Sequence, residues 1–149
     1  MKKITLLAFI LGLSFACQNN APADENTESS SISESESLKK EVMDIHDEVM
    51  PQMTPMGKLQ AQLQEASIGS EDSLTYMTAA QDLKFAKQAM MEWMRNFSST
   101  FNDNMSEEEK IEFLSAEKNK MQRIDSLTKV ALDRGQEIFT AIPVAQDSL

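Results

Sequence analysis

The chain has 149 residues, with 24 acidic against 14 basic side chains and a single cysteine, so its formal net charge is −10 at pH 7. This length favours a single domain. The acidic balance argues against a nucleic-acid-binding protein, which needs a basic face, and one cysteine excludes an intrachain disulfide.

The first 16 residues have the pattern of a signal peptide. Lys2 and Lys3 form a positive start, and the apolar run ITLLAFILGL follows from residue 4 to residue 13. This run is too short to cross a bilayer as a helix, which takes about 20 apolar residues. We therefore predict that residues 1–16 are a cleaved signal peptide and exclude them from the fold.

Cys17 comes directly after the small residue Ala16, in the sequence LSFAC. A lone cysteine behind a short apolar run is typical of lipoproteins, in which the thiol is acylated and the cysteine becomes the mature N-terminus. We therefore predict lipidation at Cys17. Because Ser14 and Ala16 also suit ordinary cleavage after small residues, plain secretion is the alternative.

The predicted lipidation also indicates where the protein is located. Removal of residues 1–16 takes away two lysines and leaves a net charge of −12, so electrostatic docking on anionic lipid is not expected. Membrane attachment would come from the acyl chains, since two or more anchor a protein stably. We predict a cell-envelope protein attached to the outer membrane, with the periplasmic or surface face left open.

Residues 17–37 combine the acylated cysteine with a polar, acidic segment, QNNAPADENTESSSISESES, that has no lysine or arginine. Such a segment has too few apolar side chains to bury, and we predict a disordered tether. About 20 flexible residues would give it a reach of roughly 25 Å.

The segment from residue 38 to residue 149 is predicted to form one all-α domain. Apolar residues recur there at alternating steps of three and four, the pattern of a helical bundle or coiled coil. We expect helices over residues 38–66, 71–97 and 107–141. The short connectors between them predict an elongated antiparallel three-helix bundle.

Local signals set several boundaries of these helices. Gly69 suits the left-handed position after a helix, and Ser106 with Glu109 forms a capping box at the start of the third helix. Pro51 and Pro55 predict a kink or short break between residues 50 and 55, with Thr54 able to cap a restart.

The apolar seams predict which side chains are buried. In the second helix the seam includes Trp93, which we expect in the core, and Phe85 lies off this seam, where it is expected to face the third helix rather than a partner. The third seam is more polar in its middle and passes through Lys118. The predicted seam positions of the third helix are Ile111, Leu114, Lys118, Met121, Ile124 or Asp125, Thr128, Ala131, Gly135 and Ile138.

The stretch VMDIHDEVMPQMTPM, residues 42–56, contains the chain's only histidine. Met43, His46, Met50 and Met53 lie on one side of a helix, about 120° around from the seam. A row of thioethers and an imidazole suits copper(I), which prefers soft ligands. Methionine also fills irregular core space, especially beside a proline kink, and we favour core packing over the copper site.

No pattern in the chain points to catalysis. There is no nucleophile elbow, no phosphate-binding glycine loop and no calcium loop, and same-helix geometry places Asp44 and Asp47 away from His46. We therefore predict that the protein is not an enzyme and needs no cofactor, with copper as the alternative ligand.

Three segments together carry a resemblance to a known group. HDEVMPQM at residues 46–53, QAMMEWMRNF at 88–97 and FLSAEKNKM at 113–121 resemble small helical lipoproteins of Bacteroidota, some of which bear the label "viral A-type inclusion protein". The resemblance implies a lipid-anchored helical domain and assigns no activity and no site. We predict a non-enzymatic helical interaction module with a possible protein partner and no nucleic acid.

Overall fold

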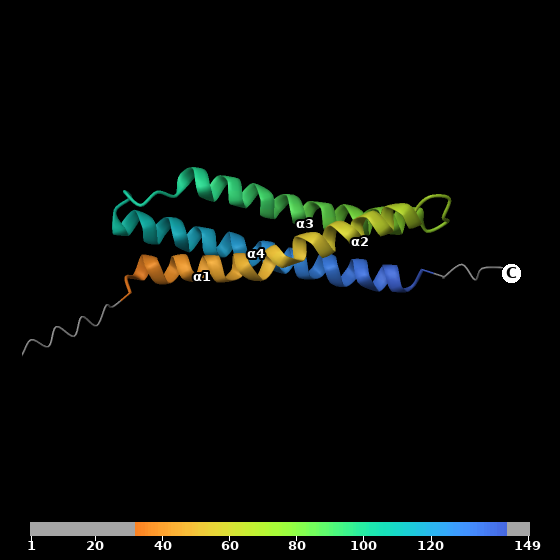
Figure 1. Ribbon diagram of the computed structural model, residues 1–149, viewed down its shortest axis with the longest axis horizontal. Helices are drawn as coiled ribbons and strands as arrows, with labels where there is room; N and C mark the ends of the chain where they lie inside the picture. The colour runs from red at the N-terminus through yellow and green to blue at the C-terminus, as the bar shows by residue number, and fades with distance from the viewer. Residues whose placement is uncertain (1–31, 143–149) are drawn as a thin grey trace, which may run out of the picture. The chain divides into compact units, whose positions relative to one another are not determined.

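A computed structural model describes residues 32–142 of the chain (Figure 1). These residues are all-α, and the predicted antiparallel bundle of three helical arms is confirmed. The first arm contains a short 3-10 segment, whereas the second and third arms are single helices. The elements are α1 (Glu34–Val49), η1 (Met50–Gln52), α2 (Met53–Ala66), α3 (Ser73–Thr100) and α4 (Glu107–Thr140).

Helix α1 begins at Glu34, whereas the sequence pattern placed the start at residue 38. Ser33 accepts a hydrogen bond from the backbone N–H of Glu36, and the Glu36 carboxylate accepts one from the backbone N–H of Ser33. This capping box satisfies two backbone donors that a helix otherwise leaves free. The predicted tether over residues 17–37 is therefore wrong in its last residues, and its first part lies outside the described residues.

The first arm breaks where it was predicted to break. Pro51 lies at the start of the 3-10 segment η1, because a proline has no N–H to offer to the preceding turn. The backbone stays right-handed on both sides of η1, and α2 resumes at Met53 without a side-chain cap, so the predicted cap by Thr54 is wrong. Pro55 lies in the first turn of α2, where a helix tolerates proline.

The break coincides with a change of packing partner. Helix α1 lies along α4, whereas α2 lies mainly along α3, and α3 and α4 lie along each other throughout (Figure 1). The first arm thus crosses over the α3–α4 pair at η1. A straight helix would keep one course along its neighbours, so the break at Pro51 allows the first arm to change partner.

The two connections also follow local signals. Gly69 has a φ of 72°, the left-handed conformation that glycine adopts without strain, and α3 follows from Ser73. At the start of α4, Ser106 and Glu109 form the predicted capping box. The hydrogen bonds that Ser106 donates to the Glu109 carboxylate hold the pKa of Glu109 below its ordinary value.

The starts of α1 and α4 are tied together by Glu107. Its carboxylate accepts hydrogen bonds from the backbone N–H of Ser35 (3.1 Å) and from the Ser35 hydroxyl (2.8 Å). These hydrogen bonds, with the backbone donor the larger cause, hold the pKa of Glu107 below its ordinary value. Ser35 is buried, so the contact fixes the first turn of α1 against the first turn of α4.

The buried side chains form two clusters with different contents. The small-residue cluster lies where α2 meets α3 and α4, and the aromatic cluster lies where α1 meets them. Gly135 also lies in the small-residue part, where a Cβ on it would come within 2.9 Å of Leu59 Cδ2. The small-residue cluster is Met56, Leu59, Leu63, Ala79, Ala80, Leu83, Ala86 and Ala131; the aromatic cluster is Val42, Val49, Met90, Trp93, Met121 and Ile124.

Candidate functional site

The candidate site is built around Trp93, the chain's only tryptophan. Its ring is buried, as predicted, with 6% of the residue exposed. Phe97 from the next turn of α3 and His46 from α1 lie beside the ring, at centroid distances of 5.0 Å and 5.8 Å. These contacts fix the indole so that its N–H points toward α4.

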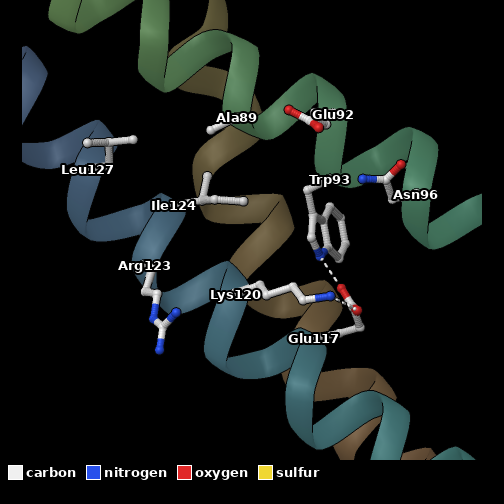
Figure 2. Close-up of a pocket in the computed structure, with 9 residues that line it drawn as sticks. All are labelled: Ala89, Glu92, Trp93, Asn96, Glu117, Lys120, Arg123, Ile124 and Leu127. Carbon is white, nitrogen blue, oxygen red and sulfur yellow. Dashed lines mark hydrogen bonds and ion pairs between the residues drawn. The ribbon is translucent and has the colours of Figure 1, made fainter.

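Glu117 of α4 receives that N–H. The Trp93 Nε1 donates to Glu117 Oε2 at 2.8 Å, and the Lys120 Nζ donates to Glu117 Oε1 at 2.7 Å (Figure 2). Only 4% of Glu117 is exposed, and burial of a carboxylate is costly unless its oxygens are paired. Here each oxygen has a donor, one of them a cation, so the buried charge is satisfied.

The identity of this buried residue corrects the predicted seam of the third helix. Lys118 was placed in the seam, but it is half-buried and forms an ion pair with Glu41 of α1. Glu117 takes the buried position instead. The tryptophan N–H that satisfies it comes from another helix, so the pattern of α4 by itself does not reveal the site.

A groove of about 380 Å³ opens between α3 and α4 beside this pair (Figure 2). Its walls combine the indole of Trp93 with the apolar side chains of Ala89, Ile124 and Leu127. Polar side chains complete the lining: Glu92, Asn96, Glu117, Lys120 and Arg123. Figure 2 shows Lys120 reaching toward Glu117 while Arg123 extends away from the pair. An apolar floor with a charged rim is the arrangement of a binding groove.

Two further hollows continue the groove on either side. One, of about 720 Å³, shares Ala89 and Glu92 with it and extends over the outer surface of α3 as far as Gln60 of α2. The other, of about 460 Å³, shares Arg123 and Leu127 with it and extends along α4. We call the combined surface of these three hollows the α3/α4 face.

The α3/α4 face exposes large apolar side chains. Phe85 is 60% exposed and Val130 is 65% exposed, and Met91 is partly exposed between charged neighbours. The prediction that Phe85 packs against the third helix is therefore wrong. Phe85 and Met91 line the hollow over α3 and Val130 lines the hollow along α4, so exposed apolar side chains border the groove on both helices.

All four residues of the predicted metal stripe are half-buried. Met50 and Met53 pack against the buried clusters, and Met43 is half-buried. His46 is half-buried against Trp93, and its Nδ1 lies 2.8 Å from Asp47 Oδ1, so the expectation that Asp47 points elsewhere is wrong. Among residues 32–142, no group of three or more His, Cys, Asp or Glu side chains is positioned to hold a metal ion.

Cys17, the predicted lipidation site, lies outside the described residues. Residues 32–142 contain no helix that is long and apolar enough to cross a membrane.

Comparison with known proteins finds no matching family model, no similar curated protein and no similar solved structure. The resemblance to Bacteroidota lipoproteins therefore stays a prediction. Function has to be inferred from the geometry of the chain itself.

Proposed function

We propose that the protein is a lipid-anchored cell-envelope protein whose helical bundle is a non-enzymatic interaction module. The observation that carries the interaction role is the α3/α4 face. It joins a groove over buried Trp93 to exposed apolar side chains, Phe85 and Val130, on two helices. Solvent-exposed aromatic and aliphatic residues around a groove are characteristic of protein-binding surfaces.

The buried polar groups support binding rather than catalysis as the role of this groove. Both oxygens of Glu117 are already engaged, by Trp93 and by Lys120. A carboxylate held in this way orients its neighbours and fixes the indole. We therefore propose a structural role for Glu117, which holds the indole and the ammonium in place.

The proposed anchor rests on the sequence around Cys17. A positive start, a short apolar run and a small residue precede this lone cysteine. Attachment through acyl chains would place the bundle at the end of a tether, at the outer membrane. Because α1 begins at Glu34, the tether would comprise about 15 residues and reach roughly 20 Å.

Replacement of Cys17 by alanine tests the anchor. Wild-type protein should be labelled by an alkyne fatty acid in growing cells and should fractionate with membranes. The Cys17→Ala variant should lose the label and leave the membrane fraction, since the proposed acyl chains would be its only attachment. Equal labelling of both proteins, or membrane fractionation that does not change, would contradict lipidation.

A further inference from the structure

We propose that the α3/α4 face binds an acidic amphipathic helix of a partner protein. This inference names the partner class of the interaction module and so rests on the proposed function. Three properties of the face carry it: its charge, its exposed apolar side chains, and its course along two neighbouring helices.

The charge of the face is opposite to that of the chain. The three hollows are lined by five cationic side chains and two carboxylates, although the whole chain has a net charge of −10. One of the two carboxylates, Glu117, is buried and already paired, so Glu92 is the acidic group of this lining that faces solvent. The cationic side chains are Lys84, Lys87, Arg95, Lys120 and Arg123.

Three of these cations are available to a partner. Within residues 32–142, no carboxylate forms an ion pair with Lys84, Arg95 or Arg123. Several cations elsewhere in the bundle are matched by acids, as Lys40 is by Asp44 and Arg134 by Asp82. Cations without acidic neighbours attract acidic groups, and this attraction selects partners and speeds association.

The outer surface of α1 differs in charge from the α3/α4 face. Its exposed charged side chains are mostly acidic, and Lys40 is the exposed cation among them. The exposed acidic residues of α1 are Glu34, Glu36, Asp44, Asp47 and Glu48. An acidic partner would be repelled from α1 and drawn to the α3/α4 face.

The apolar side chains of the face call for an amphipathic partner. Phe85 and Met91 are exposed on α3, and Val130 is exposed on α4, with half-buried Leu127 between the helices. A helix with apolar residues at helical spacing can cover such side chains while its acidic flanks meet the cations. The 380 Å³ groove over Trp93 would receive one of its large apolar side chains.

The shape of the face favours a helix over a bilayer surface. Two helices that lie along each other leave a linear groove between them, and a third helix fills such a groove by packing its ridges into it. Trp93 and Ile124 lie at the floor, below rim side chains such as Glu92 and Lys120. A flat lipid surface would meet the rim and leave the floor uncovered.

Trp93 provides the measurement, because it is the only tryptophan and lies at the floor of the groove. The probe is a synthetic peptide of about 21 residues with leucine on one helical face and glutamate elsewhere. The control peptide has lysine in place of each glutamate. Titration into the full chain carrying Cys17→Ala, followed by tryptophan fluorescence, should show saturable binding of the glutamate peptide alone, with an affinity that falls as salt rises.

Charge reversal tests the location of the binding site. Arg95→Glu combined with Arg123→Glu should weaken peptide binding about tenfold or more, because like charges at a rim repel a partner and neither arginine pairs with a carboxylate within residues 32–142 of the bundle. The matched control combines Lys40→Glu with Lys58→Glu, which changes the net charge equally on exposed residues away from the three hollows. The control should bind within about twofold of the parent protein.

Several results would overturn the proposal. These are equal binding of both peptides, no binding of either, or equal weakening by the two charge-reversal pairs. Preferential binding to phosphatidylglycerol vesicles through the same cations would assign the face to lipid instead, and self-association that shields Trp93 would assign it to a second copy. None of these results depends on lipidation, so they are distinguishable from failure of the Cys17 test.

Discussion

The two core clusters of the bundle show two ways of packing three helical arms. In the small-residue cluster, alanines such as Ala79 and Ala80 and the nearby Gly135 let leucine side chains approach the neighbouring backbone closely. In the aromatic cluster, Trp93 with Phe97 fills the space between the arms. Small residues permit close helix contact, whereas a large ring needs room and brings a polar atom with it.

That polar atom links packing to the groove. The Trp93 N–H requires an acceptor once it is buried, and Glu117 supplies one. A carboxylate inside a bundle needs a second donor, and Lys120 reaches back to it from the rim of the groove. The aromatic cluster therefore has a polar edge open to solvent. We infer that binding capacity arises where the packing is bulkiest.

The largest effect is expected from removal of the tryptophan ring. Trp93→Ala should lower the free energy of unfolding by about 3–5 kcal/mol, the usual cost of deletion of a buried large aromatic side chain. Chemical denaturation followed by circular dichroism measures it. Trp93→Phe is the control: it retains a ring but leaves Glu117 without one donor, and should cost about 1–3 kcal/mol. A decrease in the free energy of unfolding of less than about 0.5 kcal/mol for Trp93→Ala would contradict burial of the ring in the core.

Two glycines within helices sharpen the contrast between close and loose packing. A Cβ on Gly135 would meet Leu59 Cδ2 at 2.9 Å and Leu83 Cδ1 at 3.1 Å, whereas one on Gly57 would meet the mobile Lys87 Nζ at 3.1 Å. Gly135→Ala should therefore destabilise the protein by about 1 kcal/mol, because crowding outweighs the gain in helix propensity.

Gly57→Ala is the matched control, since the lysine tip can move aside. It should stabilise the protein by about 0.5–1 kcal/mol through helix propensity. Thermal and urea unfolding of the two variants gives the comparison. Stabilisation by both substitutions would contradict the close packing of Leu59 and Leu83 around Gly135.

Substitutions in the methionine stripe test whether a metal ion binds beside the aromatic cluster. Met50→Leu retains apolar volume but removes the thioether, and as a packing residue it should cost under about 1.5 kcal/mol. His46→Gln should leave copper behaviour unaltered. Competition with a copper(I) chelator measures binding in the wild type and both variants. Retention of about one copper(I) per chain that both substitutions weaken would make the stripe a metal site.

The smallest expected effect concerns how the stability of the fold decreases at acidic pH. The folded-state pKa of Glu107 is lowered from 4.5 by hydrogen bonds from Ser35, so its ionised form stabilises the fold above pH 4.5. This contribution is lost as pH falls through the lowered pKa. Glu107→Gln should reduce the melting temperature at neutral pH and flatten its decline in acid. A decline as steep as that of the wild type would show that Glu107 contributes nothing to it.

The sequence predicted the helical arms because each has a long, regular apolar seam. Val42, Val49, Met56 and Leu63 recur at steps of seven in the first arm, and all four are buried. The proline break was also predictable, since it depends on a missing backbone donor. Both features depend on residues that are close together in the sequence, so the sequence alone is enough to predict them.

The start of α1 was missed although its signal is present. Ser33 and Glu36 have the same spacing as Ser106 and Glu109, which correctly predicted the start of α4. The surrounding serines and glutamates resemble a disordered segment, so composition hid the capping box. Glu107, which holds the first turn of α1 through Ser35, lies 72 positions further along the chain, so no local pattern reveals this contact.

Glu117 could not be chosen over Lys118 from the sequence for a related reason. Both lie between buried Leu114 and Met121, and both carry charge. The donor that permits burial of Glu117 belongs to Trp93 on another helix. The sequence placed Phe85 off the seam of α3, but which side of α3 a neighbouring helix covers depends on tertiary packing that the pattern of one helix does not show.

We propose that the α3/α4 face meets a partner protein in the cell envelope. A photo-crosslinking amino acid at Glu92, on the rim of the groove, tests it most directly in living cells, with the same group at Asp44 on α1 as the control. We predict a discrete adduct from position 92 that disappears when Arg95 and Arg123 are changed to glutamate, and none from position 44. Equal adducts from both positions, or none from position 92, would contradict the claim.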